Sequence, residues 1–266
     1  MRVAKKAKKN NLTNYFCLFI FFGLIPFCHS IELTLVTENL PPFQMRDDNN
    51  KITGFATQIV QAALYKTSYS YHFEMYSWAR AYNIAQKKQN TCIFSIARTK
   101  EREHLFKWVA PIATTNSYFI GLKSNKNIKL ATLNDAKNYI TAVFKDDVTY
   151  QILIKNGFIE FKNYYVINNS DSLLKLLYLR KNIDLILIDD LTLAYRAKLD
   201  HLDPNLFKAY LKLNRAPLNF YVACSNTTSK QVINKLRTAI FQLKKSGEDK
   251  KIIEKWLSNK KVLFNE

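Results

Sequence analysis

The sequence predicts an α/β protein made of two successive units, each of which alternates strands and helices. Short apolar runs bounded by turn residues are interleaved with stretches of helical periodicity, which is typical of a sheet covered by helices. The 266-residue chain, less a 30-residue leader, leaves 236 residues, enough for one large domain or two small ones. With only five glycines it contains neither a Gly-rich phosphate loop nor a G-x-S-x-G elbow.

Residues 1–30 have the pattern of a secretory signal peptide. Arg2 and four lysines precede an apolar run over 15–27, which is shorter than the roughly 20 residues that span a bilayer. We place cleavage after Ser30, with Cys28 at the third position before the cut. An uncleaved anchor and a lipoprotein acylated at Cys28 are the alternatives, and the bulky Phe27 argues against acylation. The mature protein is therefore expected in the periplasm.

The first unit begins directly after the leader. Alternating or apolar runs predict strands over 32–37, 69–75 and 91–96. Gly54 opens a helix over 55–66, a second helix follows over 78–87, and a short polar helical turn covers 100–105. An extended apolar run over 117–124 then leads into the second unit.

The second unit repeats the alternation. Strands are predicted over 140–144, 164–167 and 185–188, and helices over 148–156, 172–179 and 191–198, with Ser170 or Asp171 as the cap of the middle helix. A further strand covers 220–224. The chain ends in an amphipathic helix over 230–245, a stop at Gly247 and a last helical stretch over 252–257.

Charge and cysteine content exclude some functions and leave others open. Without the five basic residues of the leader, 35 Lys and Arg face 21 Asp and Glu, a net charge of about +14. The lysines are scattered and the chain is exported, so we expect no nucleic-acid partner.

An oxidising compartment permits a disulfide between Cys92 and Cys224, but two buried free thiols are the simpler interpretation. No Cys/His/carboxylate spacing indicates a metal site, and no cofactor is expected.

Four segments carry a family resemblance, and together they cover nearly all of residues 31–266. They are TENLPPFQM with KITGFATQIVQAAL, then SIARTKEREHLFKWVAPI, then NIDLILIDD, and finally the tail from NFYVAC to KSGEDKKIIEKWL. In this order they resemble four features of the family 3 bacterial extracellular solute-binding proteins. These features are the Pro-Phe loop and Gly-Phe helix start, the T-x-x-R turn, the second-lobe D-x-x-x-x-D and the terminal strand and helices.

The resemblance implies a two-lobed periplasmic-binding-protein fold of type II, with two crossover hinge strands. Lobe 1 would comprise residues 31–115 and 220–266, and lobe 2 residues 116–219. It also implies the function: a monomeric periplasmic protein that captures a small polar ligand, an amino acid or a relative, and delivers it to the permease of an ABC importer. A hinge motion would close the lobes over the ligand.

The resemblance assigns the ligand's α-carboxylate to Arg102, the Arg of T-x-x-R, whose guanidinium offers two parallel donors. Ser95 matches a position that hydrogen-bonds the ligand. Outside the family context, Arg102 reads as a surface residue in a charged stretch. Two residues after Ser95 the family usually has Ser or Thr, and this chain has Ala97, so one contact is missing.

In the second lobe the resemblance assigns the ligand's amino group to Asp189. Either Asp189 or Asp190 could instead cap the following helix. Where the family commonly has a Gly-Thr turn for the ligand carboxylate, this chain has Asp146, Asp147 and Val148. Asp147 suits a helix N-terminus but would repel a nearby carboxylate. An ordinary α-amino acid therefore fits the second lobe's part of the site less well.

The pocket wall also departs from the family pattern. Leu40 stands where many members stack an aromatic ring, and Trp78 and Arg80 are the substitutes we propose for the wall and for a second cation. Trp78 could equally be a core residue at a helix start. Glu38, after the first strand, is within reach of the pocket, and its alternative role is a solvated turn residue.

Two other functions share this sequence. A cyclohexadienyl dehydratase-like enzyme on the same fold could reuse Glu38, Asp147 and Asp189 as acids and bases, although nothing in the sequence marks a tuned acid. A sensor protein that presents its ligand to a receptor would share every site residue. We expect no enzyme activity.

Overall fold

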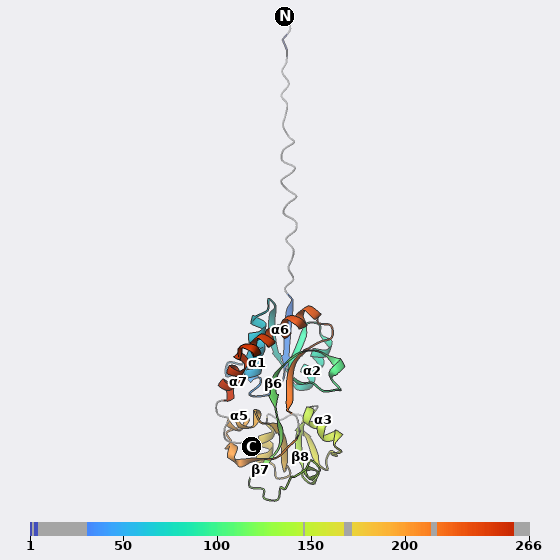
Figure 1. Cartoon of the computed structure of the whole chain (residues 1–266), viewed down its shortest axis with the longest axis vertical. Helices are drawn as coiled ribbons and strands as arrows, with labels where there is room; N and C mark the ends of the chain where they lie inside the picture. The colour runs from blue at the N-terminus through green and yellow to red at the C-terminus, as the bar shows by residue number, and fades with distance from the viewer. Residues whose placement is uncertain (2, 5–30, 146, 168–171, 214–216, 258–266) are drawn as a thin grey trace. The chain divides into compact units, whose positions relative to one another are not determined.

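The computed structural model describes residues 1, 3–4, 31–145, 147–167, 172–213 and 217–257 (Figure 1). The predicted leader lies almost wholly outside this range. The strands are β1 Glu32–Thr37, β2 Met45–Arg46, β3 Ile52–Thr53, β4 Ser70–Met75, β5 Thr91–Ala97, β6 Lys107–Thr115, β7 Ser117–Leu122, β8 Thr141–Phe144, β9 Tyr164–Ile167, β10 Leu185–Asp189, β11 Phe207–Lys212 and β12 Leu218–Cys224. The helices are α1 Phe55–Tyr65, α2 Trp78–Lys87, α3 Val148–Lys155, α4 Leu173–Leu179, α5 Thr192–Leu199, α6 Lys230–Ser246 and α7 Glu248–Leu257. None of the helices in these ranges is long and apolar enough to cross a bilayer.

Two five-stranded sheets organise residues 31–257. The first has the order β4-β1-β5-β12-β6 and the second the order β11-β7-β10-β8-β9. The chain passes from the first sheet to the second between β6 and β7 and returns between β11 and β12. Below, "first lobe" and "second lobe" mean these two sheets with the helices that cover them. The lobe limits at 115/116 and 219/220 remain predictions.

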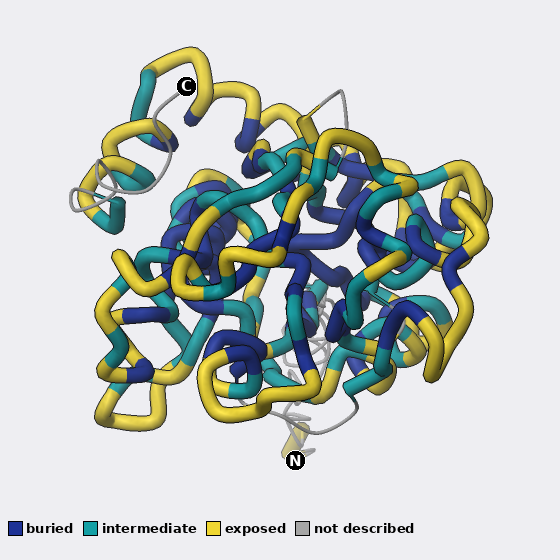
Figure 2. Tube along the Cα trace, turned by 90° about the horizontal axis from the view of Figure 1, so that it is seen from below, coloured by how far each residue is buried: buried dark blue, intermediate teal, exposed yellow. Residues whose placement is uncertain are grey.

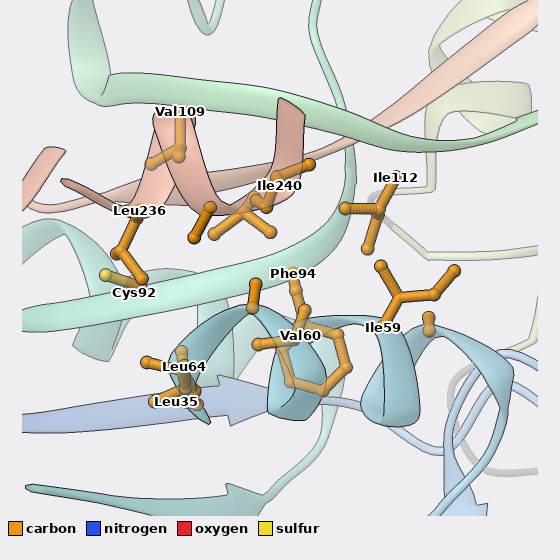
Figure 3. Close-up of a cluster of buried hydrophobic side chains, with 14 of the residues drawn as sticks. Leu35, Ile59, Val60, Leu64, Cys92, Phe94, Val109, Ile112, Leu236 and Ile240 are labelled. Atoms are coloured by element: carbon orange, nitrogen blue, oxygen red, sulfur yellow. The ribbon is translucent and has the colours of Figure 1, made fainter. Parts of the chain in front are cut away.

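Both faces of each sheet are buried. In the first lobe, α1 and α6 pack on the face that presents Leu35 and Phe94 (Figure 3), and α7 packs against these two helices. The helix α2 packs on the face that presents Val36 and Ile93. In the second lobe, α4 and α5 cover one face. Buried residues, dark blue in Figure 2, lie mostly in the interior of the trace. The two faces of a sheet bury different residues because successive side chains of a strand point to opposite faces.

Most elements begin and end within two residues of the predicted bounds, and the exceptions have identifiable causes. The strands β6 and β11 and the two-residue strands β2 and β3 were not anticipated. In β6 Pro111 interrupts the pattern; β6 is an edge strand, where a missing N–H is tolerated. The last helix starts at Glu248, four residues before the apolar stretch that predicted it. The cap of α4 is Ser172, whose hydroxyl accepts from the Lys175 N–H. The predicted caps Ser170 and Asp171 lie outside the described residues.

The expectation of free thiols is wrong. Cys92 and Cys224 are fully buried, as expected, but they form a disulfide between β5 and β12. The two residues are direct partners in the antiparallel pairing of these strands. That register could not be read from a separation of 132 residues. The bridge joins the start of the first lobe to its returning strand.

Gly54 fixes the start of α1 against the loop after β1. Its φ is +121°, and a side-chain carbon at this position would lie 2.4 Å from the Phe43 carbonyl oxygen. The amides of Phe55 and Ala56 donate to the carbonyls of Pro42 and Phe43. Only glycine allows this approach, so the Gly-Phe pattern positions the loop that carries Gln44 beside β5.

Candidate functional site

The candidate site gathers where strands end at their carboxyl termini, the usual place for ligands in an open α/β sheet. Glu38 follows β1, Ser95 lies near the end of β5, and Arg102 follows it. From the second lobe, Asp147 follows β8 and Asp189 ends β10.

Arg102 is buried, with 4% of its surface exposed. Its amide donates to the Thr99 carbonyl, so the T-x-x-R segment is a tight turn that leads into a short 3₁₀ helix, Glu103–Leu105. One guanidinium N–H donates to the Ala97 carbonyl over 3.3 Å. The alternative of a surface arginine is therefore excluded, and the role of Arg102 toward a ligand remains a prediction.

The guanidinium lies over two neighbouring aromatic rings. Its central carbon lies 5.2 Å from the Trp78 ring centroid and 5.4 Å from that of Tyr82. Trp78 and Tyr82 are four residues apart on α2 and therefore share a face, with their centroids 5.6 Å apart. Such cation–π contacts hold a guanidinium in place and are worth about 0.5–2 kcal/mol each. Burying Tyr82 raises its pKa, which Arg102 partly offsets.

Arg80 points elsewhere. Two residues after Trp78 on the same helix, it lies on another side of α2, because positions i and i+2 do not share a face. It is exposed, and its guanidinium stacks 4.1 Å from the Tyr76 ring centroid. The structure thus groups Trp78 with Arg102 and groups Arg80 with Tyr76.

Ser95 occupies a strained position inside β5. It is 3% exposed and has a φ of +60°, and the pairing with β12 shifts register there, so Ser95 is the extra residue of a β-bulge. Its hydroxyl donates to the Gln44 Oε1 over 2.7 Å. Non-glycine residues with positive φ concentrate at functional sites, because the surrounding structure must hold them there.

Glu38 has a strongly raised pKa. Its side chain keeps partial solvent exposure, yet it lies deep among protein atoms, and this desolvation raises its pKa from 4.5 to about 8. Repulsion from Asp147 raises the pKa further, and attraction to Arg102 lowers it. The environment of Glu38 is therefore not that of a solvated turn residue, and its role toward a ligand remains a prediction.

Asp147 is the N-cap of α3. One carboxylate oxygen accepts from the Thr149 amide over 3.2 Å. Desolvation raises the pKa of this group, while the hydrogen bonds from the Thr149 and Val148 amides and the charge of Arg102 lower it. Capping fixes where the carboxylate points, and its interactions with Glu38 and Arg102 place it opposite the first lobe. The neighbouring Asp146 lies outside the described residues.

Asp189 holds the start of α5. Its carboxylate accepts from the amides of Leu191 and Thr192, both over 3.0 Å, and from the Thr192 hydroxyl over 2.6 Å. Desolvation raises its pKa to about 6 despite these bonds. Asp190 accepts instead from the backbone and side-chain amides of Asn116 at the crossover. The capping role considered for this pair thus falls to Asp189, and its role toward a ligand remains a prediction.

Tyr82 and Gln44 were not anticipated. The run SWARAY contained the signal for Tyr82, because the i, i+4 spacing to Trp78 places both rings on one face. Gln44 has no exposed surface, and its Nε2 has no hydrogen-bond partner among the described residues. Leu40 packs against the first-lobe core rather than standing as a wall.

Two contacts join the lobes beside the site. On one side, Lys155 of α3 is ion-paired with Glu101. On the other, the Tyr195 hydroxyl of α5 donates to the Met45 Sδ over 3.3 Å, and its ring lies 6.0 Å from that of Trp256. Leu191 also joins the main first-lobe core. The described structure is thus one in which the lobes touch on both flanks of the candidate site.

The double crossover and the two sheets define a two-lobed binding-protein fold, and comparison with known sequences identifies the family. The profile of the bacterial extracellular solute-binding proteins, family 3, matches residues 33–259. The chain belongs to this family. Its members and structural neighbours are mainly binding proteins, not enzymes. A search of curated protein sequences gave no significant match.

Solved structures with this fold come from proteins of different roles. A histidine kinase sensor domain similar to periplasmic binding proteins has a TM-score of 0.76 at 15% identity, with 89% of this chain and 99% of that chain covered. AbpA of Streptococcus pneumoniae, an amino acid ABC transporter substrate-binding protein bound to L-arginine, has a TM-score of 0.71 at 18% identity, with 85% of this chain and 94% of that chain covered. The ancestral amino acid-binding protein AncCDT-1, a precursor of cyclohexadienyl dehydratase, has a TM-score of 0.69 at 19% identity, with 85% of this chain and 95% of that chain covered.

Proposed function

We propose that the protein captures a small polar ligand, an amino acid or a close relative, between its lobes and delivers it to an ABC importer. The observation that carries this proposal is the buried Arg102, whose guanidinium lies over the neighbouring rings of Trp78 and Tyr82 at the carboxyl end of β5. A guanidinium fixed by two rings is positioned to bind a carboxylate in two-pronged fashion, and the bond strengthens when lobe closure excludes water.

The remaining site residues act around this anchor. Ser95 contributes a hydroxyl from the bulge, Glu38 and Asp147 contribute acceptors from opposite lobes, and Asp189 positions α5. Closure turns about the segments that join β6 to β7 and β11 to β12, and the Lys155–Glu101 pair stabilises the closed form. In this proposal Arg80 has no direct contact with the ligand.

A thermal-shift screen against amino acids, amines and small organic acids tests the proposal. A ligand that binds only the folded state stabilises it by about 2.7 kcal/mol at a hundred times its Kd, which raises the melting temperature. Calorimetry on each hit then gives Kd and stoichiometry. If no compound in the screen shifts the melting temperature, the binding function is refuted.

Export is part of the proposal. Residues 1–30 would be removed after Ser30, which releases the binding protein into the periplasm. Mass spectrometry of the protein recovered from a periplasmic extract should give a chain that begins at Ile31. A chain that begins at an acylated Cys28, or an intact leader in the membrane fraction, would contradict cleavage at Ser30.

Sensing is the second candidate function, favoured by the fold shared with the histidine kinase sensor domain. The two functions differ in the partner that recognises the ligand-bound form. Crosslinking in cells, with and without ligand, should capture an ABC permease if the protein delivers its ligand. Capture of a receptor kinase instead would support sensing.

A further inference from the structure

The helix α6 carries positive charge without compensating acids. Its 17 residues, KQVINKLRTAIFQLKKS, include five basic side chains and no acidic one. The buried residues of α6 face the first-lobe core, and the basic residues are exposed on its outer side. The chain as a whole has a formal net charge of +19, of which the proposed ligand site uses one arginine. The basic residues of α6 are Lys230, Lys235, Arg237, Lys244 and Lys245.

These five cations are not neutralised by the described part of the chain. No salt bridge within 4.0 Å joins any of them to a described acid. The Arg237 guanidinium donates to the carbonyls of Trp108 and Val109, which carry no net charge. The Lys235 ammonium lies 5.1 Å from the Tyr69 ring centroid. The outer side of α6 therefore keeps its positive charge, and a partner of negative charge can reach it from solvent.

Aromatic rings are exposed among these cations. Phe241 is 66% exposed, although burial of a phenylalanine side chain is favourable. Arg237 precedes it by four residues, and Lys244 and Lys245 follow it by three and four, so they are its neighbours on the helix surface. Tyr65, at the end of α1, is 77% exposed on the same side of the first lobe, since α1 and α6 pack on one face of the sheet (Figure 1). Single exposed apolar residues are ordinary, but two rings beside unpaired cations make a surface that is both apolar and basic.

A hollow between α1 and α6 adds polar groups to this surface. Its volume is about 590 Å³, and its lining comes from the end of α1, the turn after it and α6. Two lysines line it, Lys235 and Lys66, and Lys66 also pairs with Glu248 over 3.6 Å. Cationic and hydroxyl donors suit the oxygens of a phosphate group. The hydroxyl and amide side chains of the lining are Thr67, Ser68, Asn234, Thr238 and Gln242.

We propose that the outer side of α6, with Tyr65 and the hollow beside it, binds anionic phospholipid at a membrane surface; we call it the α6 surface. Anionic headgroups attract lysine and arginine, and aromatic rings among these cations enter the boundary between headgroups and acyl chains. A second copy of this chain would present the same charge and be repelled. An acidic protein segment would match the cations alone, whereas the surface of an anionic bilayer matches both the cations and the rings.

This binding goes beyond the proposed function, because a ligand can be captured without a membrane. Export would bring the mature chain into the space beside the inner membrane. Attachment through the α6 surface would hold it near a membrane-embedded permease and raise its effective concentration there. Failure of the membrane contact would leave ligand capture standing.

Vesicle sedimentation tests the proposal with residues 31–266, which contain both sheets and exclude the apolar leader. Vesicles of phosphatidylcholine mixed equally with phosphatidylglycerol should bind the protein, and vesicles of pure phosphatidylcholine should bind it at least about tenfold more weakly. Raising the salt concentration to about 1 M should release the protein, because the Debye length is then about 3 Å. Absence of binding to both kinds of vesicle, or equal binding to both, would overturn the proposal.

Paired charge variants locate the contact. The double variant Lys244→Gln, Lys245→Gln should weaken vesicle binding about 10–30-fold, since each lysine beside an anionic surface contributes a factor of about five. The matched control is Lys87→Gln, Lys88→Gln, which removes the same charge from the end of α2 on the opposite face of the same sheet. It should change binding by less than about twofold. Equal losses in the two variants would mean that the net charge of the chain, and not the α6 surface, attracts the vesicle.

Ring variants test the apolar part of the contact. Phe241→Ser should weaken vesicle binding about 3–10-fold, and Tyr178→Ser, which removes an exposed ring from α4 in the second lobe, should leave it unchanged. Equal binding by the two variants would overturn the role assigned to Phe241. A photo-crosslinking side chain in place of Phe241 should label phospholipid in cells. Labelling of a protein alone would identify an acidic protein partner and overturn the lipid assignment.

Discussion

The two lobes share one strand arrangement and differ in what stabilises them. In each sheet three parallel strands are followed by a fourth and a fifth that alternate in direction: β4, β1, β5, β12 and β6 in the first, and β9, β8, β10, β7 and β11 in the second. The first lobe adds a disulfide and the larger core, to which α1, α6 and α7 contribute. The described part of the second lobe has two smaller clusters.

The lobes also contribute different chemistry to the site. The first lobe supplies the guanidinium, the aromatic rings and the bulged Ser95, all anchored to β5 or α2. The second supplies carboxylates at helix starts, Asp147 and Asp189, each tied to backbone amides. Under the proposed function, the first lobe, with its disulfide and larger core, would hold the ligand first, and the second lobe would complete the site on closure.

Removing the disulfide should have the largest effect on the lobe difference. The bridge closes a loop of 132 residues, so its loss in the double variant Cys92→Ala, Cys224→Ala should lower the free energy of unfolding by about 3–5 kcal/mol. Urea unfolding measures this, and hydrogen exchange should show the loss of protection concentrated in β5 and β12. Equal loss of protection in both sheets would mean that the lobes unfold as one.

Arg102→Ala should weaken ligand binding by about 2–5 kcal/mol, because a desolvated charge pair loses one partner. Calorimetry with the ligand from the screen measures it. Arg80→Ala is the matched control, since Arg80 is exposed beside Tyr76, and it should bind as the parent does. Equal affinities for the two variants would mean that Arg102 does not bind the ligand and that the first lobe does not supply the main contact.

The charge of Glu38 should make stability depend on pH. Its folded pKa, about 8, lies above the ordinary 4.5, so its contribution to stability is fully present below pH 4.5 and is lost as pH rises through 8. Glu38→Gln should therefore exceed the parent in stability at pH 8.5 by about 1–3 kcal/mol, since the side chain keeps some solvent contact. Melting curves from pH 4 to 9 check this. Parallel curves for the two proteins would show that Glu38 is not held in a desolvated site.

The contact of α5 with the first lobe should give the smallest effect. Tyr195→Ala removes the ring that faces Trp256 and should weaken ligand binding about 3–10-fold, because the closed form loses an aromatic pair. Tyr195→Phe keeps the ring and loses only the hydroxyl bond to the weak acceptor Met45, so its affinity should stay close to that of the parent. Unchanged affinity in the alanine variant would show that this contact does not contribute to closure.

Local pattern predicted those features that depend on neighbouring residues. The strand β1, the wholly buried strand β5, the helical period of α6 and its stop at Gly247 (φ +73°) are all present as expected. The four motifs placed the chain in its family, and T-x-x-R singled out Arg102. These features depend on a few consecutive residues, whose propensities and spacing act at short range.

Pairings across the fold were decided by the tertiary structure alone. The Cys92–Cys224 bridge depends on the register of β5 with β12, and the edge position of β6 explains how Pro111 is accommodated. The Ser95–Gln44 bond and the approach of Asp147 to Glu38 join segments that lie far apart in the chain. The orientation of Arg80 toward Tyr76 is set by the rotation of the helix α2. The sequence by itself thus determined the family, the elements and the anchoring arginine. The tertiary structure decided which charges meet, because burial and distance arise only when both lobes are assembled.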